Sequence, residues 1–212
     1  LADEINRTPP KTQAALLQGM QERTISAGTK HYQLPRPFFV LATQNPIEQE
    51  GTYPLPEAQL DRFFFNLVIG YPSLDEERDI VLQTTGRGQT VPQQVLTPDQ
   101  ILELQQLVLD VPVPGHVLDA VLKLTHSSRP ESDLADDFIK QYVAWGAGPR
   151  ASQNLPRAAR ALAFLNGQPA ASLEELRQVA LPVLRHRVIP NYNATGEGVS
   201  VEQIIEHILE AL

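Results

Sequence analysis

Apolar residues in the first 72 positions recur with two different periods, which predict alternating helices and strands. Ala15, Leu16 and Met20 recur at helical spacing behind a Pro-Pro pair, which predicts a helix over residues 12–22. Residues 24–34 alternate in polarity on both sides of Gly28, as is typical of a β-hairpin. Two short apolar runs, at 38–43 and 63–69, predict buried strands. We therefore expect an α/β fold with a mostly parallel sheet whose faces are covered.

Beyond Tyr71-Pro72 the strand signals stop and helix-start residues follow one another. Thr97-Pro98-Asp99 is typical of a capped helix start, and Ser172 opens a capping-box pattern. We place a domain boundary at residue 72, with part of an α/β domain over residues 1–72 and an all-helical domain over residues 73–212. The helices expected in this second domain cover residues 74–85, 97–109, 152–165 and 200–212, with two more beginning at Pro114 and Ser172.

The composition is that of an ordinary globular protein, with 212 residues of which 42% are apolar and 20% charged. No apolar stretch approaches the roughly 18 residues that span a bilayer, and no secretory leader opens the chain. Cysteine is absent, which excludes disulfides and zinc–thiolate sites, and the histidines lack metal-ligand spacing. We expect a soluble, cytoplasmic protein that enters no membrane.

The net charge of −8 is distributed unevenly along the chain. Residues 73–137 carry a net −8, whereas residues 138–187 form a basic island of +5. Because neutralisation of phosphates drives nucleic-acid binding, the acidic total argues against a nucleic-acid partner. A DNA-binding helical domain would depend on the basic island alone.

The first chemical candidate is Asp3-Glu4, directly after an apolar stub. In nucleotide hydrolases such a pair lies at the carboxyl end of a sheet strand. There the aspartate holds Mg²⁺ through water, and the next carboxylate polarises the attacking water. A solvated pair is the commoner meaning of this dipeptide, and we interpret Asp75-Glu76 in that way.

The second candidate is Asn45, which follows the apolar run at 38–43. If the two strands are parallel neighbours, Asn45 lies at the same sheet edge as Asp3-Glu4. An amide at that edge can donate to a γ-phosphate or orient a water without adding charge. Asn45-Pro46 fits a simple turn equally well.

The third candidate is Arg62, between Asp61 and Phe63. It is either a surface arginine paired with Asp61, which contributes little stability, or a cation at a domain edge that reaches the phosphates of a neighbouring subunit.

Together these motifs resemble the MoxR family of AAA+ ATPases. The resemblance rests on LADEINRTPPKTQ at 1–13, ATQNP at 42–46 and EAQLDRF at 57–63. It implies that Asp3 and Glu4 are the Walker B pair, that Asn45 is sensor 1, and that Arg62 is an arginine finger acting on an adjacent subunit. The hairpin at 24–34 resembles the pre-sensor-1 hairpin, which often faces the central pore of the ring. The implied fold is a truncated P-loop AAA+ core, with the later strands of its parallel sheet, followed by a helical lid.

Arg150 lies in Gly-Ala-Gly-Pro-Arg at a predicted helix start. A helix N-terminus favours anions, so a cation there is unfavourable unless a phosphate lies nearby. In AAA+ lids such a start resembles sensor 2, whose arginine reaches the nucleotide. Arg157 and Arg160 fit a solvated basic helix face instead.

The resemblance implies an ATPase that uses ATP and Mg²⁺ to remodel or assemble partner proteins, in the manner of a chaperone. Metal-cofactor insertion is one such task. The implied partners are other subunits of a ring, expected to be a hexamer, and a client protein such as a metalloenzyme or a von Willebrand A-type domain. Mg²⁺ would be held by Asp3 through water.

The Gly-rich P-loop with its lysine is absent from these residues, and in the family it precedes Walker B. We expect the chain as given neither to bind ATP tightly nor to hydrolyse it. The alternative is a non-catalytic interaction scaffold with the same fold. The gene upstream of Leu1 distinguishes the two, because a P-loop there favours the enzyme.

Overall fold

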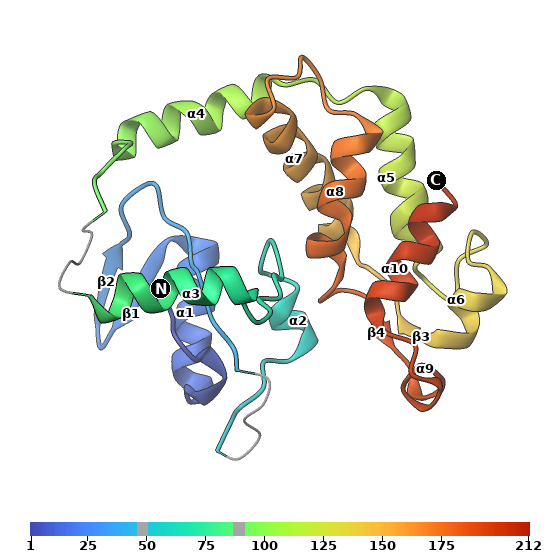
Figure 1. Ribbon diagram of the computed structural model, residues 1–212, viewed down its shortest axis with the longest axis horizontal. Coiled ribbons are helices and arrows are strands. Elements are labelled where there is room, and N and C mark those ends of the chain that lie inside the picture. Colours follow the sequence, from blue (N-terminus) through green and yellow to red (C-terminus); the bar gives the residue numbers. More distant parts are fainter. Residues whose placement is uncertain (46–50, 87–91) are drawn as a thin grey trace.

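The computed structural model describes residues 1–45, 51–86 and 92–212, and its elements follow one another as shown in Figure 1. The first part of the chain holds a 3₁₀ helix (Ile5–Arg7), α1 (Pro10–Glu22), β1 (Thr24–Ala27), β2 (Lys30–Gln33), α2 (Glu57–Leu60) and α3 (Leu74–Thr85). The second part holds α4 (Pro98–Asp110), α5 (Gly115–Ser127), α6 (Asp137–Tyr142), β3 (Val143–Trp145), α7 (Pro149–Leu165), α8 (Leu173–Leu184), β4 (Ile189–Pro190), α9 (Tyr192–Glu197) and α10 (Val201–Glu210). None of the described helices is both long enough and apolar enough to cross a membrane.

The helix and the hairpin predicted in the first 34 residues are both confirmed. Helix α1 has proline at its first position, where no amide hydrogen is needed, and it ends at Arg23 in a left-handed conformation. Strands β1 and β2 pair antiparallel, with Thr24 opposite Gln33, around a turn in which Gly28 has φ of 63°.

The two strands predicted at 38–43 and 63–69 are wrong as buried strands. Residues 38–43 form only one isolated parallel bridge, between Ala2 and Ala42, and residues 63–69 form no strand. Leu41 is 60% exposed and Ile69 is 93% exposed. A strand is buried when neighbouring strands take up its backbone groups and helices cover its faces. Within the described residues, only the stub at Leu1–Asp3 runs beside 41–43.

The second half of the chain contains one continuous apolar core. It is formed where α5, α7, α8 and α10 pack together, with α7 lying along α8 (Figure 1). Its largest fully buried side chains are Leu124, Ile139, Leu155, Leu176, Leu184, Ile204 and Ile205. Helix α7 begins three residues before the predicted start. This region was expected to be all-helical, but β3 and β4 add a short antiparallel pair, with Val143 opposite Pro190.

Helices α3 and α4 connect the two halves. Both begin with capping boxes, at Ser73 and Thr97; the capped start at Thr97 was predicted, whereas the cap at Ser73 was not. Helix α4 packs against α7, whereas every residue of α3 is exposed, including Leu74 and Leu82.

Candidate functional site

The stub carrying Asp3 and Glu4 runs parallel to the segment that leads to Asn45. The Ala2 amide donates to the Leu41 carbonyl at 2.7 Å, and the Thr43 amide donates to the Ala2 carbonyl at 3.0 Å. The expectation that these two segments are parallel neighbours is therefore confirmed, although the ladder is a single bridge.

Thr43 joins the two carboxylate-bearing residues. Its hydroxyl donates to Asp3 Oδ1 at 2.5 Å and accepts from the Glu4 amide at 2.8 Å. Glu4 has a left-handed backbone, with φ of 49°, and its carboxylate is 3.3 Å from Arg7 Nε. Asp3 is exposed and Glu4 is half-buried, so both carboxylates are accessible at this edge.

Asn45 lies at the same edge, two residues beyond Thr43. Its backbone carbonyl accepts a hydrogen bond from Asn6 Nδ2 at 3.4 Å, which joins it to the loop after the carboxylates. Pro46, the last residue of the predicted motif, lies outside the described residues. The structure thus brings Asp3, Glu4 and Asn45 to one edge, as their positions after two parallel segments predict.

Gln13 binds the backbone next to this edge, a role that we did not predict. It is 2% exposed on α1, and its amide donates to the carbonyls of Ile5 at 3.1 Å and Tyr53 at 2.8 Å. The sequence could have indicated this role, because a glutamine on the inner face of a predicted helix needs hydrogen-bond partners for its buried amide.

Arg62 lies directly after α2 and is exposed. Its guanidinium donates to Gln21 Oε1 on α1. Asp61 forms its ion pairs with Arg150 and Arg187, so the interpretation of Arg62 as the partner of Asp61 is wrong.

Asp61 is shared by two arginines of the second half of the chain. Arg150 Nη1 lies 2.8 Å from Asp61 Oδ2, and Arg187 Nε lies 2.8 Å from Asp61 Oδ1. Burial alone would raise the pKa of Asp61, but the hydrogen bonds and charges of the two arginines outweigh it and lower that pKa. Arg150 is therefore stabilised at the start of α7 by a carboxylate, which removes the need for a phosphate that we inferred from its position alone.

Arg185, His186 and Arg187 follow α8 and form the junction between the two halves. Arg185 donates to the Asn66 carbonyl at 2.9 Å and pairs with Glu202 at 2.8 Å. His186 Nε2 lies 3.1 Å from the Phe63 carbonyl. Burial and the adjacent charge of Arg187 lower the pKa of His186 to about 4, so this imidazole is neutral at pH 7 and donates through Nε2.

The basic island predicted at 138–187 thus has a partly structural explanation. Two of its cations, Arg185 and Arg187, bind carbonyls and carboxylates across this junction. Sequence reasoning missed them, because their partners lie about 120 positions earlier in the chain. Arg157 is exposed, as predicted for a solvated face, whereas Arg160 is half-buried.

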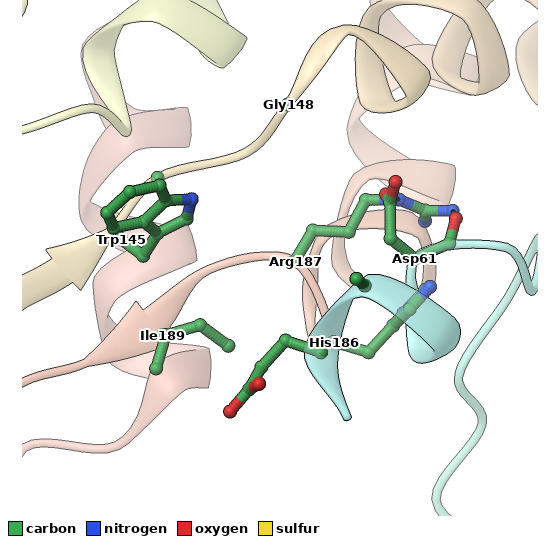
Figure 2. Close-up of a pocket in the computed structure, with 9 residues that line it drawn as sticks. Asp61, Trp145, Gly148, His186, Arg187 and Ile189 are labelled. Carbon is green, nitrogen blue, oxygen red and sulfur yellow. Dashed lines mark hydrogen bonds and ion pairs between the residues drawn. The ribbon is translucent and has the colours of Figure 1, made fainter. Parts of the chain in front are cut away.

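A cavity of about 490 Å³ lies beside the junction. Trp145 and Ile189 lie on one side of it, and Asp61 and Arg187 lie on the other (Figure 2). The complete lining is Glu57, Ala58, Asp61, Trp145, Gly146, Gly148, His186, Arg187 and Ile189. Gly146 is required here because a Cβ at this position would lie 2.4 Å from the Ser128 carbonyl oxygen.

The donor set at the Asp3 edge fits a magnesium ion held through water. The Asp3 carboxylate and the Thr43 hydroxyl place two oxygen atoms 2.5 Å apart. Mg²⁺ prefers oxygen ligands and keeps several of its waters. Within the part of the chain that the structure describes, no three His, Cys, Asp or Glu side chains group as direct metal ligands.

Two protein-family models match the chain. The model of the ATPase family associated with various cellular activities (AAA) matches residues 1–65, and the model of the AAA lid domain matches residues 136–208. The predicted fold class, part of an AAA ATPase domain followed by a helical lid, is confirmed by these matches.

Relatives and a solved structure extend the similarity over nearly all of the chain. Chaperone MoxR1 of Mycobacterium tuberculosis is 43% identical over 214 residues, which cover 100% of this chain and 56% of that protein. Protein MoxR of Paracoccus denitrificans is 31% identical over 217 residues, covering 93% of this chain and 62% of that protein. The crystal structure of a Cytophaga hutchinsonii protein, provisionally named an ATPase, superposes with a TM-score of 0.93 at 38% identity and covers 100% of this chain and 64% of that one. The chain therefore spans less than two thirds of each relative's length.

Proposed function

Because the chain belongs to the MoxR family of AAA+ ATPases, we propose that it forms part of an enzyme that hydrolyses ATP to remodel or assemble partner proteins. The observation that carries this proposal is the Thr43 hydroxyl, which joins the Asp3 carboxylate and the Glu4 amide at the edge where Asn45 also lies. That arrangement supports a nucleotide site rather than a solvated acidic pair.

Each residue at this edge has a proposed role. Asp3, oriented by the Thr43 hydroxyl, holds Mg²⁺ through water. Mg²⁺ held there would supply positive charge against the charge that develops on the transferred phosphate. Glu4 orients the attacking water and accepts its proton, and Asn45 donates its amide to the transferred phosphate.

Arg62 acts on the site of an adjacent subunit. Its exposure after the end of α2 supports this role, because an arginine finger has to project from the surface of its own subunit to reach the next one. The protein would then work as a ring, which we propose is a hexamer. Arg150 is paired with Asp61 here, so to reach the nucleotide from the lid its guanidinium would have to exchange that carboxylate for a phosphate.

The client is a protein, in keeping with the chaperone name of one relative. A metalloenzyme that receives its cofactor, or a von Willebrand A-type domain, is the proposed client class, and the proposed location is the cytoplasm. The 212 residues contain no Gly-rich loop with a following lysine, so we propose that they do not hydrolyse ATP by themselves.

The decisive test is Arg62→Ala in the full gene product. Hydrolysis should fall by about 10³-fold or more, since a finger contributes mainly to the transition state, while nucleotide binding stays within about threefold. Phosphate release and fluorescent-nucleotide titration measure the two. Arg78→Ala is the matched control, because it removes a different exposed arginine, which lies on α3.

Mixed rings test whether the finger acts between subunits. Arg62→Ala subunits keep their own carboxylates, and Glu4→Gln subunits keep their finger. Mixing the two should restore part of the activity if Arg62 completes a neighbour's site. Hydrolysis that survives in pure Arg62→Ala rings would show that the finger assignment is wrong.

A further inference from the structure

One buried arginine of the lid contacts the residues on both sides of Arg62. Arg187 follows α8, and only 1% of its side chain is exposed. Its Nε donates to Asp61 Oδ1 at 2.8 Å, and its Nη2 donates to the carbonyls of Asp61 at 2.9 Å and Phe63 at 2.5 Å. Its Nη1 donates to the carbonyls of Phe64, at 3.2 Å, and Val183.

These contacts use every donor that a guanidinium has. Arginine carries five N–H groups in a planar fork, and each has an acceptor here. A buried cation is tolerated only when it is paired and its hydrogen bonds are made, and Asp61 supplies the countercharge. Lysine has three donors arranged around one point, so it cannot reproduce this pattern.

The geometry fixes the backbone before and after Arg62 while its side chain points elsewhere. The bound carbonyls belong to Asp61 and Phe63, the immediate neighbours of Arg62, and to Phe64. His186 Nε2 also binds the Phe63 carbonyl. The Arg62 guanidinium instead contacts Gln21 on α1, away from the lid.

We propose that Arg187 is a positioning residue for Arg62. The lid of one subunit would then determine where the Arg62 guanidinium lies in its neighbour's site. This inference rests on the proposed function of Arg62 as a finger. A displacement of about 1 Å at a catalytic group costs about 10²-fold in rate, so a shift of that size in the backbone beside Arg62 would be enough to impair the finger.

The test is Arg187→Lys in the full gene product, because lysine keeps the charge beside Asp61 but loses the fork. We expect kcat for ATP hydrolysis to fall by about 10²-fold, with nucleotide affinity within about threefold. The matched control is Arg177→Lys on α8, whose guanidinium donates only to the Leu209 carbonyl among its described contacts, and which should keep the parental kcat.

Mixed rings separate positioning from a general structural effect. Arg187→Lys subunits should keep an intact site of their own but have a misplaced finger, so mixing them with Glu4→Gln subunits should restore activity, as is expected for Arg62→Ala. A purely structural role would not give this rescue. Unchanged kcat in Arg187→Lys, absence of rescue, or loss of nucleotide binding together with hydrolysis would each overturn the inference.

The two proposals fail in different ways. If Arg62→Ala rings remain active, the proposed finger is wrong, whatever Arg187→Lys does. If Arg62→Ala rings are inactive while Arg187→Lys rings work at the parental rate, the finger stands and only its positioning by the lid is wrong.

Discussion

The first 72 residues and the lid differ in how far they bury their apolar side chains. Beyond residue 110, a continuous cluster of buried aliphatic residues joins α5, α7, α8 and α10. Among the residues before position 73 whose burial the structure describes, Ile5, Leu17 and Leu55 are the buried apolar side chains, while Phe39, Leu67 and Ile69 are largely exposed. A helix satisfies its own backbone hydrogen bonds, whereas an extended segment needs strands beside it. Helices can therefore pack into a core where isolated extended segments cannot.

The largest expected effect on stability comes from a substitution that creates a cavity in the lid core. Leu176 is fully buried on α8, so Leu176→Ala should lower the free energy of unfolding of the 212-residue chain by about 2–5 kcal/mol. Ile69→Ala, at a 93% exposed position, should change it by less than about 0.5 kcal/mol. Urea denaturation followed by circular dichroism measures both, and equal losses would contradict the contrast.

Acid should weaken the junction between the two regions. Burial lowers the pKa of His186 from 6.5, its ordinary value in an unfolded chain, to about 4 in the folded protein. Between these values the unfolded state holds more protons, so stability falls as pH falls, by up to about 3 kcal/mol. The free energy of unfolding, measured from pH 7 to 4, should show this slope.

His186→Gln keeps an amide donor for the Phe63 carbonyl and should flatten the slope between pH 6.5 and 4. His116→Gln, at an exposed position at the start of α5, is the matched control. If the slope in His186→Gln equals that of the parent, the imidazole is not its source.

The smallest effect concerns two identical capping boxes in different surroundings. Ser172 caps α8, which lies in the lid core, so Ser172→Ala should lower the global free energy of unfolding by about 1 kcal/mol. Ser73 caps α3, whose residues are all exposed, so Ser73→Ala should affect only local amide exchange protection in α3. A comparable global loss in both variants would mean that α3 unfolds together with the lid.

Local signals explain which elements the sequence could predict. The proline before α1, Gly28 in the hairpin, and the caps at Thr97 and Ser172 act within a few residues, and all four predictions are confirmed. Burial of residues 63–69 depends on distant partners, and instead of a sheet this segment meets the lid, where the Asn66 amide donates to the Pro182 carbonyl at 2.8 Å.

The candidate site divides in the same way. The common edge of Asp3 and Asn45 follows from two parallel segments, which a pattern of apolar runs can indicate. The partners of Asp61 do not follow from any pattern, because Arg150 and Arg187 are 89 and 126 positions away. A charged residue in a basic stretch gives no sign of whether it faces water or a carbonyl.

The Arg187 junction also sets different limits on sequence variation at its two ends. Apart from the Asp61 carboxylate, its acceptors across the junction are the peptide carbonyls of Asp61, Phe63 and Phe64, which any amino acid would supply. At the lid end, only a guanidinium offers the required fork of donors. Position 187 is thus restricted by chemistry, whereas positions 63 and 64 are free of that restriction and can vary with the surfaces they contact.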